Sequence, residues 1–161
     1  MPTHKICHRN ELPLWIRQLP RPLVFTNGVF DLLHVGHVEY LQAARQLGAS
    51  LVVGINSDRS VHSLGKGPGR PLNTSADRAA VIAALECVSL VTVFEESAPL
   101  MLLSEIKPDI YVKGGDYRHR TLRESELVQQ WGGSAVMLDY YEGHSTTHLI
   151  ERAHQICERR N

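Results

Sequence analysis

The sequence has no excess of charge, no long apolar run and no leader-like start. Seventeen Lys and Arg residues balance seventeen Asp and Glu residues over 161 positions, so the chain has no net basic field to hold nucleic acid. No apolar run approaches the roughly 20 residues that cross a bilayer, and residues 1–13 lack the apolar centre of a secretory signal. We therefore expect a cytoplasmic protein with neither a nucleic-acid nor a membrane partner.

Cysteine is scarce as well. The three cysteines, Cys7, Cys87 and Cys157, are far apart and form no CxxC pair. This pattern fits neither a disulfide framework nor a structural zinc site, which needs paired ligands at short spacing. We expect reduced thiols and no metal held by protein side chains alone.

Two common nucleotide-binding motifs are also missing. The phosphate loop GxxxxGK[ST] occurs nowhere in the chain. Residues 65–71, GKGPGRP, superficially resemble a dinucleotide-binding fingerprint, but their glycines are spaced G-x-G-x-G and follow a predicted helix. A P-loop enzyme and a nicotinamide-dependent dehydrogenase are therefore disfavoured.

The chain does contain a regular alternation of strands and helices. Short runs rich in branched apolar residues predict strands at 23–26, 50–55, 88–94, 109–112 and 135–138, with helical periodicity between them. Such alternation predicts a Rossmann-like α/β fold, with a doubly wound parallel sheet of five strands. We expect a single domain over residues 1–161: residues 1–21 form a lead-in with a short helix, and residues 22–159 form the α/β core.

Residues 23–48 join the first strand to a helix through the glycine turn at Asn27-Gly28. Helical spacing begins at Val35, so His34 and His37 lie where the helix starts. A helix start carries unpaired N–H groups and partial positive charge, which favour phosphate. Two imidazoles three residues apart can donate to one phosphate group, although such a pair alone also fits core or surface histidines.

Three more polar loops lie at or beyond strand ends, where ligands of doubly wound sheets bind. Lys66 and Arg70 lie on the glycine loop and are either phosphate clamps or solvated cations. Asp116, in the loop of residues 113–116, is expected to bind sugar hydroxyls or to help hold Mg²⁺ through water. The alternative is a simple turn residue. Residues 145–147 open the last helix as caps, as phosphate ligands, or as both. We expect these loops to form one composite site.

Two segments resemble a known family. Residues 26–37, TNGVFDLLHVGH, resemble the HxGH signature of the cytidylyltransferase-like nucleotidyltransferases, and residues 142–147, EGHSTT, resemble their second signature. KGPGRP at 66–71, the helix carrying Asp77-Arg78, and KGGDY at 113–117 are similar to the D-glycero-β-D-manno-heptose 1-phosphate adenylyltransferases. Tyr140 stands where glycerol-phosphate cytidylyltransferases tend to have arginine, and His144 replaces the small or apolar residue usual before STT.

The resemblance implies a HUP-type fold and transfer of AMP from ATP to the heptose phosphate, giving ADP-heptose and pyrophosphate for lipopolysaccharide core. It also implies Mg²⁺, a homo-oligomer, expected to be a dimer, and a separate heptose kinase, because the chain is too short to contain one. The attacking phosphate is already anionic, so catalysis needs positioning and charge stabilisation and no activated nucleophile. The alternatives are a cytidylyltransferase acting on glycerol 3-phosphate and a non-catalytic nucleotide-binding domain.

We assign three sets of site residues on these grounds. The catalytic residues are expected to be His34, His37 and Lys66. The ATP-binding residues are expected to be Asn27, Gly28, Val29, Phe30, Asp31, Arg78, Gly143, Ser145, Thr146 and Thr147. The sugar-phosphate-binding residues are expected to be Arg70, Lys113, Gly114 and Asp116. Phe30 is expected to pack beneath the nucleotide, and Asp31 to orient the turn or a histidine.

Overall fold

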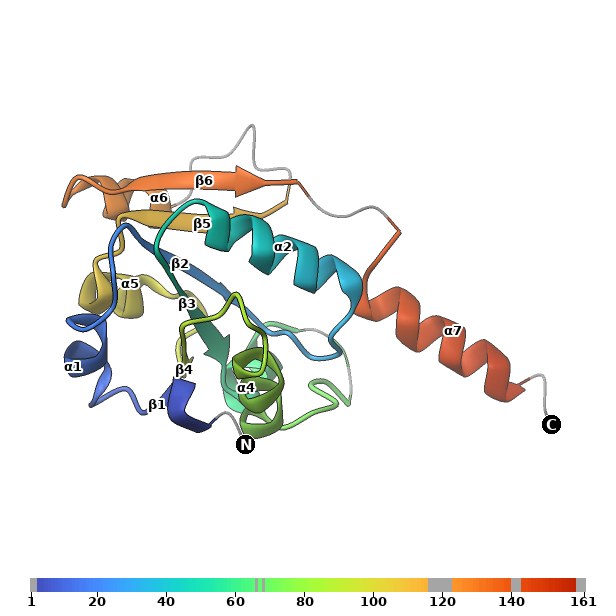
Figure 1. Ribbon diagram of the computed structural model, residues 1–161. Coiled ribbons are helices and arrows are strands. Elements are labelled where there is room, and N and C mark those ends of the chain that lie inside the picture. Colours follow the sequence, from blue (N-terminus) through green and yellow to red (C-terminus); the bar gives the residue numbers. More distant parts are fainter. Residues whose placement is uncertain (1–2, 66, 68, 116–122, 140–142, 159–161) are drawn as a thin grey trace.

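A computed structural model of the chain describes residues 3–65, 67, 69–115, 123–139 and 143–158. Strands and helices alternate along almost the whole of this part (Figure 1). The strands are β1 (Ile6–Cys7), β2 (Leu23–Gly28), β3 (Ser50–Asn56), β4 (Leu90–Phe94), β5 (Ile110–Gly114) and β6 (Ser134–Leu138). The helices are α1 (Leu12–Ile16), α2 (Val35–Gln46), α3 (Asp58–Ser63), α4 (Ser75–Ala83), α5 (Leu100–Ile106), α6 (Arg123–Gln129) and α7 (Thr146–Glu158), preceded by the 3₁₀ turn η1 (Thr3–Lys5).

All the described strands belong to one parallel sheet in the order β1-β4-β3-β2-β5-β6. From β2 the chain proceeds outward through β3 and β4, then returns to the other side of β2 for β5 and β6. This reversal of direction confirms the predicted doubly wound α/β sheet and puts its switch point beside β2. The predicted count of five strands is wrong, because the sheet has six strands.

The additional strand comes from the lead-in. Ile6 and Cys7 pair in parallel with Val91 and Thr92 of β4. Two residues are too few to show a period-2 or a continuous apolar pattern, so sequence periodicity has no signal for β1. The strand exists because the edge of β4 offers it backbone partners.

Hydrophobic clusters cover both faces of the sheet. On one face, Leu41 and Ala44 of α2 and Ile82 of α4 pack with residues of β2, β3 and β4. On the other face, Leu102 of α5 and Val128 of α6 pack with a second set of strand residues. Every residue of β3 is buried, as expected of a central strand covered by helices on both sides. The core therefore holds the carboxyl ends of β2, β3 and β5 in a rigid row.

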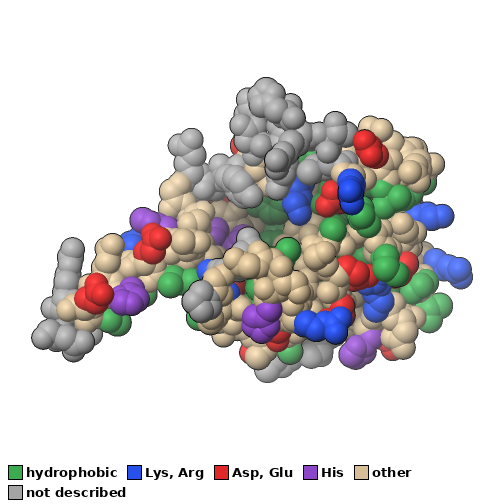
Figure 2. All heavy atoms as spheres, turned by 180° about the vertical axis from the view of Figure 1, so that it is seen from behind, with side chains coloured by type: hydrophobic (Ala, Val, Ile, Leu, Met, Phe, Trp, Pro, Cys, Tyr) green, Lys and Arg blue, Asp and Glu red, His purple; other side chains and the backbone are tan. Residues whose placement is uncertain are grey.

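Helix α7 projects away from this body (Figure 1), and none of its 13 residues is buried. Acidic, histidine and hydrophobic side chains lie along it in the space-filling view (Figure 2). It begins at Thr146, because Ser145 caps it: Ser145 Oγ accepts from the His148 N–H at 3.1 Å. Within the part of the chain that the structure describes, no helix combines the length and apolar character needed to cross a membrane.

Candidate functional site

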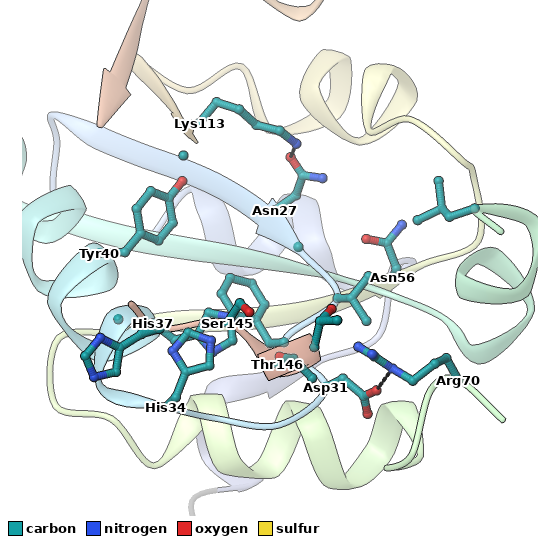
Figure 3. A pocket seen from close by; sticks show the side chains of 18 of the residues that line it. Asn27, Asp31, His34, His37, Tyr40, Asn56, Arg70, Lys113, Ser145 and Thr146 are labelled. Carbon is teal, nitrogen blue, oxygen red and sulfur yellow. Dashed lines mark hydrogen bonds and ion pairs between the residues drawn. The ribbon is translucent and has the colours of Figure 1, made fainter. Parts of the chain in front are cut away.

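A cavity of about 1040 Å³ opens at the carboxyl ends of the central strands. Its walls come from the turn after β2, the starts of α2 and α7, the ends of β3 and β5, and the segment after β4 (Figure 3). The predicted site residues on its lining are Asn27, Gly28, Val29, Phe30, Asp31, His34, His37, Arg70, Lys113, Gly114, Gly143, Ser145, Thr146 and Thr147. The structure thus brings together loops that are more than 100 residues apart in the chain. Lys66 and Asp116, also predicted for the site, lie outside the described residues.

The turn after β2 is shaped by Phe30, which has a left-handed backbone with φ of 48°. A non-glycine residue seldom adopts this conformation, and such residues concentrate at functional sites. The Phe30 ring lies so close to Gly28 that a Cβ at Gly28 would stand 2.9 Å from its Cε2 atom. The ring is buried and meets the His37 ring edge-on at 5.2 Å between centroids. Phe30 therefore packs beneath the turn and supports a histidine, and its place beneath the nucleotide stays a prediction.

His34 and His37 form a stacked pair at the start of α2. Their ring centroids are 3.8 Å apart with 20° between the planes. The Nδ1 atoms of both rings are buried and have no hydrogen-bond partner among the described residues. Buried polar atoms are nearly always paired, and exceptions in native structures call for an explanation such as a catalytic role or a bound water or ion.

Burial also controls the charge of the two rings. Burial and, to a smaller extent, the proximity of His34 together lower the pKa of His37 to about 4, against an opposing hydrogen bond with the Leu32 backbone. Burial likewise lowers the pKa of His34, with an added contribution from His144. Both imidazoles of the pair are therefore mainly neutral at pH 7 in the free protein, and each has one N–H to donate.

Gly36, between the two histidines, lies where no side chain fits well. A Cβ added there would be 3.1 Å from His34 Nδ1 and 3.3 Å from His144 Cβ. Both contacts are tighter than a Cβ atom normally makes. The glycine of the HxGH signature is thus explained by the close approach of the His34 ring and the segment before α7.

Asp31 ties the glycine loop to the turn after β2. Its carboxylate, 1% exposed, accepts from Arg70 Nε at 2.6 Å and from the backbone N–H groups of Leu72 at 2.8 Å and Asn73 at 3.0 Å. Asn73 Nδ2 donates back to the Asp31 carbonyl at 2.8 Å. We expected Asp31 to orient the turn or a histidine; the contacts of its carboxylate run to the Arg70 loop and tie that loop to the turn. Arg70 is held against the cavity wall by this ion pair (Figure 3).

Arg78 requires a correction. The sequence predicts that it binds ATP, but its side chain is fully buried and is absent from the cavity lining. Its guanidinium donates to the carbonyls of Val29 at 2.6 Å, Asn56 at 2.8 Å and Asn73 at 3.0 Å, and it pairs with Asp58 at 2.7 Å. Five N–H groups in a rigid fork suit such multiple carbonyl contacts. Arg78 therefore joins the ends of β2 and β3 to the loop before α4, and so positions the wall of the site.

The opposite wall is built on β5. Lys113 Nζ donates to Asn27 Oδ1 at 3.3 Å, and the Tyr111 hydroxyl donates to the same oxygen at 3.0 Å. The Asn27 amide is oriented by these two contacts at the end of β2. Figure 3 shows Lys113 and Asn27 on one side of the cavity and Arg70 with Asp31 on another. Lys113 and Arg70 thus add positive side chains to the cavity lining, besides the histidine pair.

Sequence reasoning missed several lining residues. Tyr40 lines the cavity, with its hydroxyl 2.6 Å from Thr26 Oγ1 and donating to the Val112 carbonyl at 3.2 Å. Other unassigned lining residues are Gly36, Asn56, Leu64, Ser97, Ala98, Pro99, Glu124, His144 and His148. Asn56 ends β3 and residues 97–99 follow β4, so the rule that ligands bind at strand ends was a signal that could have found them. Tyr40 had no such signal, because it lies inside a helix.

The cavity at the strand ends of this doubly wound sheet is lined by two histidines at the start of the first crossover helix and by cationic side chains. Such a site is typical of a nucleotide-handling protein. The profile of the cytidylyltransferase-like family matches residues 25–152, which include the turn, the histidine pair and the start of α7. The chain belongs to the cytidylyltransferase-like family, whose members are nucleotidyltransferases.

Relatives of high identity cover most of the chain. D-beta-D-heptose 1-phosphate adenylyltransferase of Bordetella bronchiseptica is 55% identical over 153 residues, 94% of each chain. Bifunctional protein HldE of Syntrophotalea carbinolica is 52% identical over 136 residues, and HldE of Streptomyces coelicolor 55% over 131 residues. These alignments cover 84% and 81% of this chain but only 28% of each HldE protein.

Solved structures support the fold. A lipopolysaccharide core biosynthesis protein from Thermoplasma volcanium superposes with a TM-score of 0.63 at 28% identity, covering 76% of this chain and 98% of that one. Pantoate-beta-alanine ligase from Francisella tularensis gives a TM-score of 0.56 at 14% identity, covering 83% of this chain and 66% of that one, and shows a likeness of fold alone.

Proposed function

We propose that this protein transfers AMP from ATP to D-glycero-β-D-manno-heptose 1-phosphate and releases pyrophosphate, in the biosynthesis of lipopolysaccharide core. The stacked pair of His34 and His37 facing a cavity between Arg70 and Lys113 carries the proposal. The heptose is suggested by the 55% identical Bordetella relative, which aligns over 94% of both chains.

The reaction requires an oxygen of the sugar phosphate to attack the α-phosphorus of ATP. That bond forms as the bond from the α-phosphorus to the bridging oxygen breaks, and pyrophosphate leaves. Neutral imidazoles of His34 and His37 donate N–H groups to triphosphate oxygens that gain charge, without repelling each other as two imidazolium ions would. Arg70 on one flank, with Lys66 of the same loop, and Lys113 on the other hold the phosphates in line.

The remaining predicted residues have supporting roles in this proposal. Asn27, Gly28 and Val29 present the turn to the nucleotide, and Ser145, Thr146 and Thr147 present the N-terminal N–H groups of α7 to its phosphates. Gly114 leaves room for close approach of the sugar phosphate beside Lys113, and Asp116 binds its hydroxyl groups.

Mg²⁺ in this proposal accompanies the triphosphate and neutralises part of its charge. Among the described residues, no group of three or more His, Cys, Asp or Glu side chains could hold a metal ion. The Asp31 carboxylate on the cavity lining is already engaged by Arg70 and two backbone N–H groups. The described donors on the cavity wall suit phosphate oxygens, and a bound Mg²⁺ would be held largely by oxygens of ATP and water.

We also propose that a separate heptose kinase in the cytoplasm makes the sugar phosphate, and that the protein is a dimer. The HldE relatives are named bifunctional, and this chain spans about 28% of their length. Light scattering on a sizing column tests the dimer directly: a single species of about 18 kDa, the mass of one chain, would contradict it.

The activity is tested by pyrophosphate release with ATP or CTP against heptose 1-phosphate of either anomer and against glycerol 3-phosphate. We expect release with ATP and the β-anomer alone. Turnover of CTP with glycerol 3-phosphate, and none with ATP and heptose phosphate, would make the protein a cytidylyltransferase. Calorimetric binding of ATP with no product over hours would identify a non-catalytic nucleotide-binding domain.

A further inference from the structure

His144 lines the cavity, although it is neither one of the stacked histidine pair nor the residue that caps α7. It stands between Gly143, whose φ is 77°, and Ser145, which caps α7. The left-handed Gly143 turns the chain so that residue 144 reaches the start of α2. There the His144 Cβ lies so close to Gly36 that a Cβ on that glycine would stand only 3.3 Å from it.

The His144 ring is tilted by 38° toward that of His34, with 6.4 Å between the centroids. His34 and His37, at 3.8 Å, are stacked with no room between them. The wider gap between His34 and His144 is suited to a small anion, since two N–H···O bonds of about 2.9 Å can converge on one phosphoryl group across it. The two rings also interact electrostatically, because His144 contributes to lowering the pKa of His34.

We propose that His144 is a third phosphate-binding imidazole, which contacts the triphosphate of ATP together with His34. This inference rests on the proposed function, because it assumes that the cavity takes a nucleoside triphosphate. Unlike His37, His144 is exposed, so its ring loses little solvation before the ligand arrives. A hydrogen bond to a charged group contributes enough to change affinity roughly tenfold or more.

Binding of a graded series of nucleotides tests the proposal without requiring turnover. The dissociation constants of ATP, ADP and AMP are measured by calorimetry for the wild type, His144→Ala and His154→Ala. His154 is the matched control, since it is an exposed histidine of α7 two turns beyond the site, paired with Glu158 at 3.3 Å. We expect His144→Ala to weaken ATP about tenfold and AMP less than twofold, and His154→Ala to change neither.

Three outcomes would overturn the inference. Equal weakening of ATP and AMP by His144→Ala would place the ring on the base or ribose. Unchanged binding of all three nucleotides, with the wild type binding ATP, would remove His144 from the site and leave the proposed function standing. Absence of ATP binding by the wild type would defeat both. A double-mutant cycle with His34→Ala adds a sharper criterion: additive losses would contradict a shared phosphoryl group.

Discussion

Asp31 and Arg70 form a nearly buried ion pair, 2.6 Å from oxygen to nitrogen, between two loops that are 39 residues apart in the chain. The Asp31 side chain is 1% exposed and that of Arg70 14%. A carboxylate withdrawn from water in this way depends on its partners, because solvent cannot compensate its charge. The pair therefore joins the turn after β2 to the glycine loop and holds Arg70 at the cavity.

Replacing Asp31 by Ala should destabilise the protein by about 3–5 kcal/mol, because it leaves a buried guanidinium and two N–H groups unpaired. Denaturant unfolding measures the loss. The matched control is Arg21→Ala, which breaks an ion pair of similar length, 2.7 Å, to Asp109, with side chains 50% and 38% exposed. We expect that exposed pair to be worth no more than about 1 kcal/mol. Equal effects of the two substitutions would refute a special role for the Asp31 pair.

Replacing either His34 or His37 by Ala should lower kcat about 10²–10³-fold, the usual cost of losing one preorganised donor to a developing charge. Steady-state kinetics of pyrophosphate release checks this. His62→Ala is the control, since His62 is an exposed histidine of α3 that is not on the cavity lining. A near-normal kcat in both site variants, with the fold intact, would remove the pair from the mechanism.

The low pKa of His37 predicts a particular pH dependence of stability. Burial lowers this pKa to about 4 in the folded protein, while in the unfolded chain it is about 6.5. Between these values the unfolded state binds more protons, so the contribution of His37 is complete above pH 6.5 and is lost as the pH falls toward 4. His37→Asn should lose less stability across that window than the wild type, as measured by denaturant unfolding at several pH values. Parallel curves for the two proteins would contradict the assignment.

Gly36→Ala tests the close approach at the helix start. The new Cβ would lie 3.1 Å from His34 Nδ1 and 3.3 Å from His144 Cβ, so one ring must shift by a few tenths of an ångström. We expect kcat to fall about tenfold or more, because small displacements of catalytic groups are costly, while the melting temperature changes little. Normal turnover would show that the HxGH glycine has no steric role here. Gly132→Ala is not a suitable control, since its φ of 82° makes it strained in its own right.

Arg78→Met should destabilise the protein by about 3–5 kcal/mol, because three carbonyls and Asp58 lose their buried partner. Asp58→Ala serves as a comparison: the Asp58 side chain is 40% exposed and its loss leaves the three carbonyl contacts of Arg78 in place. We expect a clearly smaller effect for Asp58→Ala. If Arg78→Met instead kept full stability and lost only ATP affinity, the predicted direct contact with ATP would be restored.

Local patterns in the sequence were sufficient for the architecture and for the centre of the site. The alternation of strands and helices predicts the doubly wound sheet, and the strand, glycine turn and helix of residues 23–48 place His34 and His37 at a helix start. Each of these features depends on residues within one strand, turn or helix, where spacing and turn rules apply.

Only the tertiary structure decided the contacts between distant segments. Arg78 donates a hydrogen bond to the carbonyl of Val29, 49 residues earlier in the chain. Thr146 donates one to the carbonyl of Leu32, 114 residues earlier. Burial of Arg78, the pairing of Asp31 with Arg70, and the place of His144 beside His34 all follow from how the loops meet above the sheet. No local period or cap encodes such meetings, because they arise when the packed core brings the strand ends together.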